Sequence, residues 1–261
     1  MSIKIEDIIT LAREAGEAIL EVYKRDFDVE IKDDKSPLTE ADKKANEIIV
    51  AKLKELYPEI PILSEEEKAA AYETRKQWGT FWLVDPLDGT KEFIKKNGEF
   101  TVNIALIENH TPVLGVVFAP VLDKMYYGTT ENGSWLSTEK AEPVKLPRIT
   151  NDEKEKAMTV VASRSHMSEE TEQFIEALKS KTASVNTISI GSSLKLCLVA
   201  EGEADVYPRL GPTMEWDTAA AHAVVVNAGK KVLVYENGAT TETSLSYNKE
   251  NLLNPFFVVT E

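Results

Sequence analysis

Two aspartates that follow a run of apolar residues are the first candidates for chemistry in this sequence. Asp85 and Asp88 stand in the stretch FWLVDPLDGT, residues 81–90. The four apolar residues favour a buried strand, and Pro86 is expected to end it because proline donates no backbone N–H to a sheet. Two carboxylates, followed by Gly89 and the hydroxyl of Thr90 at the start of a helix, suit divalent cations and phosphate.

A surface turn is the alternative interpretation, because Asp-Gly pairs are common in turns. The apolar strand directly before the pair favours a functional role. A phosphatase with an aspartyl nucleophile needs two aspartates at positions i and i+2, on one face of an extended chain. Asp85 and Asp88 are three positions apart with a proline between them, so we interpret them as metal ligands.

Composition and charge limit the class of protein. The chain has 261 residues, of which 43% are hydrophobic, and no run of about 18 apolar residues that would span a membrane. The 30 basic and 44 acidic residues give a net charge of -14, which argues against a nucleic-acid polymer as partner. A phosphorylated substrate would then require divalent cations. The acidic N-terminus is not expected to be a signal peptide, and the single Cys197 suits a reducing cytoplasm, the expected location.

The first half is expected to be an antiparallel sheet covered by two helices. Apolar residues keep a helical period to about residue 24 and again from residue 39 to residue 56, with a polar connector at 32–37. Short strands are expected at 61–63, 100–107, 113–119 and 124–128, with a hairpin turn at Asn132-Gly133. The polar stretch 139–156 suggests a boundary between an N-terminal α+β half, 1–150, and a C-terminal α/β half, 151–261.

Two acids in the first half have competing interpretations. Asp42 lies three residues after Thr39, which is the spacing of a capping box at a helix start, and this structural role is favoured on sequence logic. Glu65 follows a short apolar strand, so it could complete a metal site or belong to a solvated run of acids with Glu66. The residues themselves leave this second choice open.

The second half alternates strands and helices, which indicates an α/β layer. Strands are expected at 159–163, 185–190, 205–207, 231–235 and 256–259, and helices at 168–180, 192–200 and 215–227. Polar residues at the strand ends suggest an anion pocket; they are Ser165, His166, Gly191, Ser192 and Arg209. Asp217, in the expected first turn of a helix, is either a cap or a third metal carboxylate.

Two motifs together carry a resemblance to a known family. Residues 83–90 (LVDPLDGT) and 215–220 (EWDTAA) resemble the two signatures of the inositol monophosphatase superfamily, whose members are metal-dependent, lithium-sensitive phosphatases. The likeness covers essentially the whole chain. Residues 90–94 (TKEFI), 97–103 (NGEFTVN), 163–166 (SRSH) and 191–195 (GSSLK) resemble its 3′(2′),5′-bisphosphate nucleotidases.

The resemblance implies a fold and a set of roles. The fold would be α+β, a layered αβαβα sandwich of the inositol monophosphatase and fructose-1,6-bisphosphatase type. Two or three Mg²⁺ ions would be bound by Glu65, Asp85, the Leu87 carbonyl, Asp88 and Asp217. Asp42 and Thr90 would orient the attacking water, which makes capping the minority interpretation of Asp42. Substrate contacts would come from Gly89, Thr90, Ser165, His166, Gly191, Ser192, Lys195 and Arg209.

The implied reaction is hydrolysis of the 3′-phosphate of 3′-phosphoadenosine 5′-phosphate to AMP and phosphate, a step of sulfur metabolism, by a metal-activated water. The partner is thus a small phosphorylated nucleotide, and the protein is expected to be a monomer or homodimer. One alternative is an inositol monophosphatase or fructose-1,6-bisphosphatase with the same metal site. Another is a nucleotide-binding protein without activity, which the complete set of acids disfavours.

Overall fold

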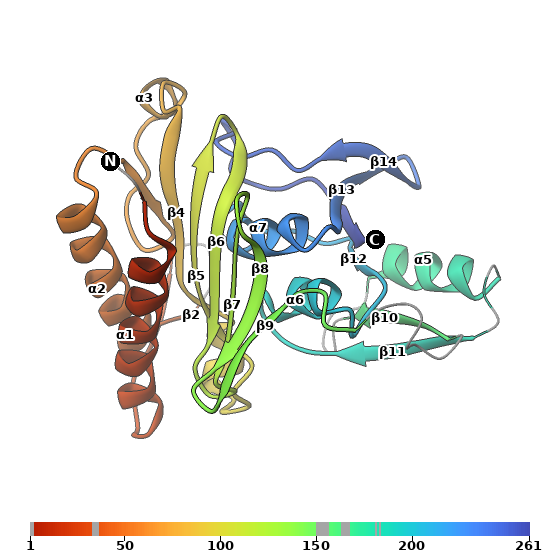
Figure 1. The fold of residues 1–261 in the computed structure, drawn as a ribbon, viewed down its shortest axis with the longest axis horizontal. Helices are drawn as coiled ribbons and strands as arrows, with labels where there is room; N and C mark the ends of the chain where they lie inside the picture. Colours follow the sequence, from red (N-terminus) through yellow and green to blue (C-terminus); the bar gives the residue numbers. More distant parts are fainter. Residues whose placement is uncertain (1–2, 33–36, 150–156, 163–167, 181, 183) are drawn as a thin grey trace.

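Five layers of helices and sheets make up the computed structural model (Figure 1). It describes residues 3–32, 37–149, 157–162, 168–180, 182 and 184–261. Helices α1 (Ile5–Tyr23) and α2 (Glu40–Leu56) form the first layer, and a seven-stranded sheet forms the second. Helices α6 (Leu194–Glu201) and α7 (Ala219–Asn227) follow, then the strands of the second half, and then α5 (Glu169–Lys179). The predicted αβαβα sandwich is confirmed.

The large sheet has the strand order β3-β4-β5-β6-β7-β8-β9. Strands β3 and β4 are parallel, and every later pair is antiparallel. The strands are β3 (Ile62–Ser64), β4 (Thr80–Asp88), β5 (Thr101–Glu108), β6 (Thr111–Ala119), β7 (Lys124–Thr129), β8 (Gly133–Thr138) and β9 (Ala141–Lys145). The short helix α3 (Tyr72–Arg75) joins β3 to β4, and α4 (Thr90–Ile94) follows β4.

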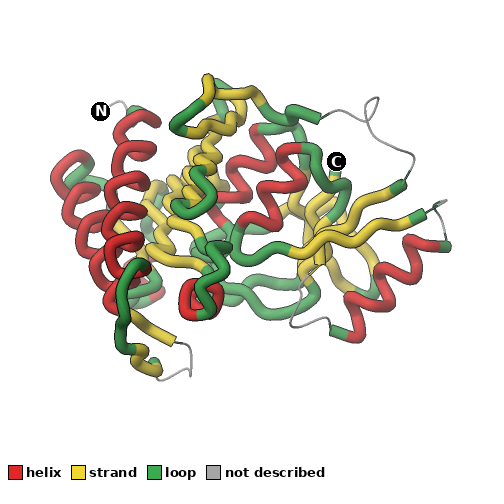
Figure 2. Tube along the Cα trace, turned by 90° about the horizontal axis from the view of Figure 1, so that it is seen from below, coloured by secondary structure: helices red, strands yellow, loops and turns green. Residues whose placement is uncertain are grey.

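Both faces of this sheet are covered, which explains the continuous apolar run in β4. Trp82 and Val84 pack with the residues of α1 and α2, whereas Phe81 and Leu83 pack with those of α6 and α7. The tube view in Figure 2 shows the two helical layers on opposite sides of the strands. Helix α7 lies so close to the sheet that a Cβ on Gly115 would be 2.1 Å from the Ala220 carbonyl oxygen.

Smaller sheets complete the chain. Strands β10 (Met158–Ala162) and β11 (Val185–Ser189) pair in parallel. A four-stranded antiparallel sheet has the order β12-β15-β13-β14, with β12 (Tyr207–Arg209), β13 (Lys231–Glu236), β14 (Ala239–Ser244) and β15 (Phe257–Thr260). Near the N-terminus, β1 (Val29–Ile31) pairs with β2 (Pro37–Thr39). Among the described residues, no helix combines the length and apolar character needed to cross a membrane.

Three details differ from the sequence-based expectations. Strand β4 does not end at Pro86 but continues to Asp88, because the pairing with β5 shifts register between Asp85 and Asp88 and leaves the proline outside the ladder. Helix α7 begins at Ala219, so Asp217 lies in a turn before the helix rather than in its first turn. The polar stretch 139–156 contains β9, an edge strand of the large sheet. The division into halves at residue 150 stays a prediction.

Candidate active site

The end of β4 forms a tight turn that brings several polar groups together. The buried Asp85 carboxylate accepts a hydrogen bond from the Leu87 N–H at 3.1 Å. Gly89 has a φ of +94°, and a Cβ there would lie 3.2 Å from the Glu99 carbonyl oxygen. The position therefore requires glycine for both conformation and space. Helix α4 begins directly after it, with the Phe93 N–H donating to the Gly89 carbonyl.

Three carboxylates from separate parts of the chain meet beside this turn. Glu65 follows β3, Asp85 lies near the end of β4, and Asp217 precedes α7. Each offers an oxygen atom, and these oxygens all lie within 4.8 Å of one another. The cluster contains Glu65 and not Glu66. Because β3 and β4 are parallel, Glu65 and Asp85 lie together at the carboxyl ends of these two strands.

The electrostatics of the cluster favour a bound cation. Burial, with repulsion from Glu65 and Asp88 next, raises the pKa of Asp85 well above its ordinary value. Burial and then Asp88 raise the pKa of Asp217 to about 8. Burial also raises the pKa of Glu65, against the effect of a nearby lysine. Carboxylate oxygens packed in this way are the hard ligands that Mg²⁺ prefers, so the residues present fit such an ion.

Asp88 lies beside this cluster but is bonded to the second half of the chain. Its Oδ2 accepts hydrogen bonds from the Ser193 N–H at 2.6 Å and from the Ser193 hydroxyl at 2.7 Å. Ser193 precedes α6, and its hydroxyl also reaches the Asp217 carbonyl oxygen at 3.4 Å. From the sequence, Ser193 is expected only as part of the helix start at residues 191–193, with no role for its side chain, since a serine there is ordinarily a cap.

Asp42 forms the capping box and also contacts Thr90. Its Oδ2 accepts from the Thr39 N–H and hydroxyl, so the capping box at the start of α2 is present. Its Oδ1 accepts from the Thr90 hydroxyl at 3.2 Å, which links the cap to the β4 turn. Burial raises the pKa of Asp42, against the hydrogen bonds from Thr39 that lower it.

Lys32 reaches the acid cluster from the end of β1. Its Nζ lies 2.9 Å from Glu65 Oε1 and 2.6 Å from Glu66 Oε1. No residue pattern predicts this contact, because Lys32 stands in a polar connector whose contacts depend on the tertiary fold. A positive side chain thus partly neutralises two of the acids.

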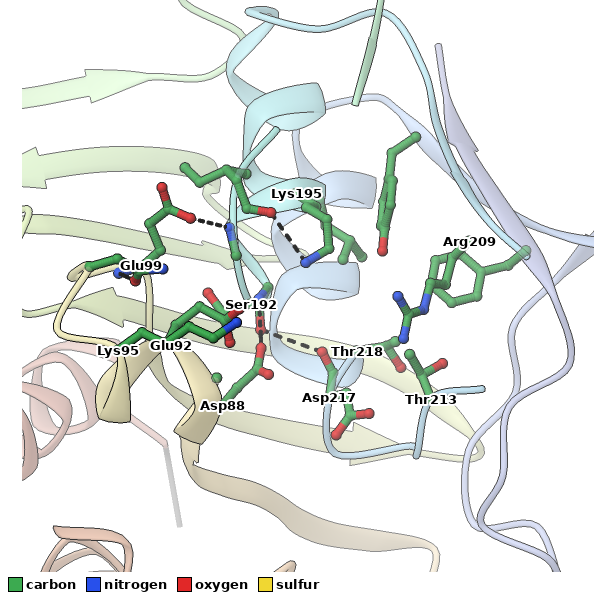
Figure 3. A pocket seen from close by; sticks show the side chains of 18 residues that line it. Asp88, Glu92, Lys95, Glu99, Ser192, Lys195, Arg209, Thr213, Asp217 and Thr218 are labelled. Atoms are coloured by element: carbon green, nitrogen blue, oxygen red, sulfur yellow. Dashed lines mark hydrogen bonds between the residues drawn. The ribbon is translucent and has the colours of Figure 1, made fainter. Parts of the chain in front are cut away.

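A cavity of about 400 Å³ opens next to Asp88 and Asp217. Lys195 and Arg209 contribute to its lining, together with Gly89, Glu92, Lys95, Asn97, Glu99, Gly191, Ser192, Tyr207 and Thr213. In the view of Figure 3, Asp88 and Asp217 lie below Lys195 and Arg209. The volume is in the range of small-molecule sites, roughly 300–1,000 Å³.

Lys195 and Arg209 have unmet capacity to bind anions. The pKa of Lys195 is lowered to about 8, mainly by burial. The charge of Asp88 opposes this shift, and the charge of Arg209 adds to it. Its Nζ contacts the Ile190 carbonyl oxygen at a long 3.5 Å. Arg209 donates from Nη2 to the Pro212 carbonyl oxygen at 2.8 Å, but its buried Nε has no partner among the described residues.

The backbone before α6 differs from the predicted anion site. The Gly191 N–H donates to Glu99 Oε2 at 2.8 Å, and the Ser193 N–H is bonded to Asp88. Two of these amides therefore contact carboxylates of the protein itself, since residues 88–99 pack directly against the loop. The Ser192 hydroxyl is buried without a partner in the described part of the chain. Ser165 and His166 lie outside the described residues.

A buried network holds the turn that carries Asp217. Glu215 accepts from the N–H groups of Asn248 and Lys249, at 2.6 and 2.9 Å, and from the Lys249 ammonium at 2.6 Å. Arg75 of α3 donates to Asn248 Oδ1 and to the carbonyl of Lys249. The segment after β3, which contains Glu65, is thereby joined to the turn that contains Asp217.

Comparison with known proteins agrees with this geometry. Residues 4–255 match the Inositol monophosphatase family. The chain belongs to that family. A Salmonella typhimurium protein named 3′(2′),5′-bisphosphate nucleotidase CysQ is 47% identical over 258 residues, 98% of this chain and 99% of that protein.

Solved structures of the inositol monophosphatase family show the same fold. The crystal structure of CysQ from Bacteroides thetaiotaomicron superposes with a TM-score of 0.85 at 47% identity, covering 98% of this chain and 96% of that one. The Thermotoga maritima IMPase, at 24% identity, has a TM-score of 0.75 and covers 98% and 91%. This second likeness concerns the fold alone.

Proposed function

We propose that this protein is a Mg²⁺-dependent phosphatase that removes the 3′-phosphate of 3′-phosphoadenosine 5′-phosphate and releases AMP. One observation carries the proposal: Asp217 of the acid cluster, with the neighbouring Asp88, lines the same cavity as the cationic side chains of Lys195 and Arg209. A substrate with two phosphates needs both features. The relatives named as bisphosphate nucleotidases, at 47% identity over nearly the full length, support this choice.

Glu65, Asp85 and Asp217 are the residues that would hold Mg²⁺, with Asp88 and the Leu87 carbonyl added by family likeness. The ion would supply positive charge for the phosphate and lower the pKa of the attacking water. Lithium sensitivity is part of the same proposal.

The chain itself provides the path for the proton. The Thr90 hydroxyl donates to Asp42, so its oxygen is free to accept from a water. As the water oxygen bonds to phosphorus, its proton passes to Thr90, and the Thr90 proton passes to Asp42. The bond between phosphorus and the ribose 3′ oxygen breaks, and that oxygen takes up a proton from solvent to give the 3′ hydroxyl of AMP. Burial raises the pKa of Asp42, which suits a proton acceptor.

Lys195 and Arg209 would bind the second phosphate. Burial lowers the pKa of Lys195, and the negative charge of a bound phosphate would favour its charged form. The Arg209 Nε, which has no partner among the described residues, can donate to a phosphate oxygen. The amides of Gly89 and Thr90 are proposed to contact the phosphate that is cleaved. Gly191 and Ser192 would border the nucleoside, and Ser165 and His166 remain proposed contacts by family likeness.

The test is Mg²⁺-dependent phosphate release from 3′-phosphoadenosine 5′-phosphate and from inositol 1-phosphate, each with and without lithium. Strong preference for the nucleotide, with inhibition by lithium, is the expected result. Preference for inositol 1-phosphate would discard the nucleotide and keep the metal centre. Absence of turnover with both substrates would overturn the proposed activity.

A further inference from the structure

Asn103 is a buried amide side chain that no protein group satisfies. Its residue is 1% exposed, and neither Oδ1 nor Nδ2 has a hydrogen-bond partner among the described residues. An unsatisfied buried polar group costs about 1–3 kcal/mol. Such groups are rare in folded proteins, and a functional role or a bound water is the usual explanation.

The register of the sheet places Asn103 next to the acid cluster. It lies directly opposite Asp85 in the antiparallel pairing of β4 with β5. Side chains in this relationship are on one face, with Cβ atoms about 4.5–5.5 Å apart. Phe81 and Leu83, which share the face of Asp85, and Ala105, which shares the face of Asn103, all pack in the same hydrophobic cluster under α7.

On its other side, Asn103 faces a residue whose side chain cannot form a hydrogen bond with it. Its opposite residue on β6 is Val117, which is apolar. The Asp85 carboxylate, by contrast, can accept about four hydrogen bonds. Among the described residues, only the Leu87 N–H is seen to donate to it. The Asp85 carboxylate and the Asn103 amide are thus adjacent buried groups, and each can form hydrogen bonds that the described residues do not supply.

We propose that Asn103 is a positioning residue of the metal centre, holding the Asp85 carboxylate through one buried water. A buried water ordinarily bridges polar groups that lack other partners. Hydrogen bonds to a ligating carboxylate fix its orientation, and their loss typically weakens metal affinity 10- to 100-fold. The inference rests on the metal centre of the proposed function and assigns Asn103 no contact with the substrate.

The test measures Mn²⁺ affinity of the full chain by titration calorimetry, with the melting temperature in excess chelator as a second measurement. Asn103→Leu keeps a similar volume and removes both polar atoms. We expect its dissociation constant for Mn²⁺ to rise about 10- to 100-fold. Asn103→Ser, whose hydroxyl can still hold a water, should recover part of the affinity and serves if the leucine variant does not fold.

Trp82→Phe is the matched control. The buried indole N–H of Trp82 on β4 also lacks a partner in the described ranges of the chain. Trp82 packs on the opposite face of the sheet, so its replacement should leave Mn²⁺ affinity unchanged. If Asn103→Leu binds Mn²⁺ as the wild type does and only melts earlier, Asn103 is a structural residue and the inference is wrong. If the wild type itself does not bind Mn²⁺, the metal centre of the proposed function fails and the inference fails with it.

Discussion

The ammonium group of Lys32 lies 2.9 Å from Oε1 of Glu65, one of the three carboxylates that form the acid cluster. A cation of the protein therefore contacts a group that is proposed to bind Mg²⁺. The side chains are only 19% and 24% exposed, so the pair is shielded from solvent. Binding of a metal by the Glu65 carboxylate would therefore compete with this contact.

Replacement of Lys32 by methionine should strengthen Mg²⁺ binding. The change removes a cation that contacts the Glu65 carboxylate, and it removes the repulsion between that cation and Mg²⁺. Partly buried ion pairs are worth on the order of 1 kcal/mol, so we expect the dissociation constant to fall several-fold. Calorimetric titration with Mg²⁺ measures this. Lys43→Met is the control, since Lys43 pairs with Glu30 on the surface, outside the cluster. Weaker binding in the Lys32 variant would show that the lysine supports the site.

Asp88→Asn tests the acid that joins the two halves. The amide oxygen can still accept from Ser193, so the fold should be kept while a negative charge is lost from the metal centre. We expect kcat to fall by at least about 10²–10³, the cost of removing one charge-stabilising group. Steady-state phosphate release measures the loss, and circular dichroism checks the fold. Asp26→Asn, on the exposed surface, should be fully active. Retained turnover in Asp88→Asn would contradict the assignment.

Stability without metal should depend on pH through Asp217. Its pKa in the folded chain is raised to about 8 from an ordinary value of 3.8. The contribution of Asp217 to the free energy of unfolding is therefore fully present below its ordinary pKa, and it is lost as pH rises through its pKa in the folded chain. One such proton gives a slope of up to about 1.4 kcal/mol per pH unit.

The window for this measurement is set by His222. Burial lowers its pKa to about 3 from 6.5, so its effect has the opposite sign and is confined to lower pH. Urea unfolding in excess chelator between about pH 6.5 and 7.5 separates the acids from His222 and from Lys195, whose pKa of about 8 would add an effect of opposite sign at higher pH. Wild type should lose stability across this range, and Asp217→Asn should lose less. Equal slopes in the two proteins would show that Asp217 does not carry this titration.

Lys195→Gln should show which of the two substrate phosphates Lys195 contacts. Loss of a charged hydrogen bond to a buried phosphate costs roughly 1.5–3 kcal/mol, so KM for 3′-phosphoadenosine 5′-phosphate should rise about 10- to 100-fold. The kcat should change little, because Lys195 does not belong to the acid cluster. Adenosine 3′-phosphate, which lacks the second phosphate, is the control substrate and should show a much smaller change. An equal rise for both substrates would place Lys195 at the cleaved phosphate.

Arg75→Met tests the network behind the Asp217 turn. The change leaves Asn248 Oδ1 and the half-buried carbonyl of Lys249 without their donor. Each unsatisfied group costs about 1–3 kcal/mol, so we expect the free energy of unfolding to fall by about 2–4 kcal/mol. Urea unfolding in chelator measures it. Arg13→Met, which removes a surface ion pair with Glu139, should cost less than about 1 kcal/mol.

The sequence alone determined the layers and the chemical character of the site. The apolar run of residues 81–84 indicated a buried strand, the helical periods indicated two helices that cover the first sheet, and the family resemblance implied the full sandwich. The motifs around Asp85 and Asp217 indicated the family. These features are local, because strand and helix patterns and turn residues depend on neighbours along the chain.

Only the tertiary structure decided which side chains meet. It placed Glu65 rather than Glu66 in the acid cluster, brought Lys32 to the same carboxylate, and used Asp42 as cap and partner of Thr90 at once. It also set Asn103 opposite Asp85 through strand register. Each of these is a contact between segments distant in sequence. Such contacts follow from register and layer packing, which residue patterns along one segment do not specify.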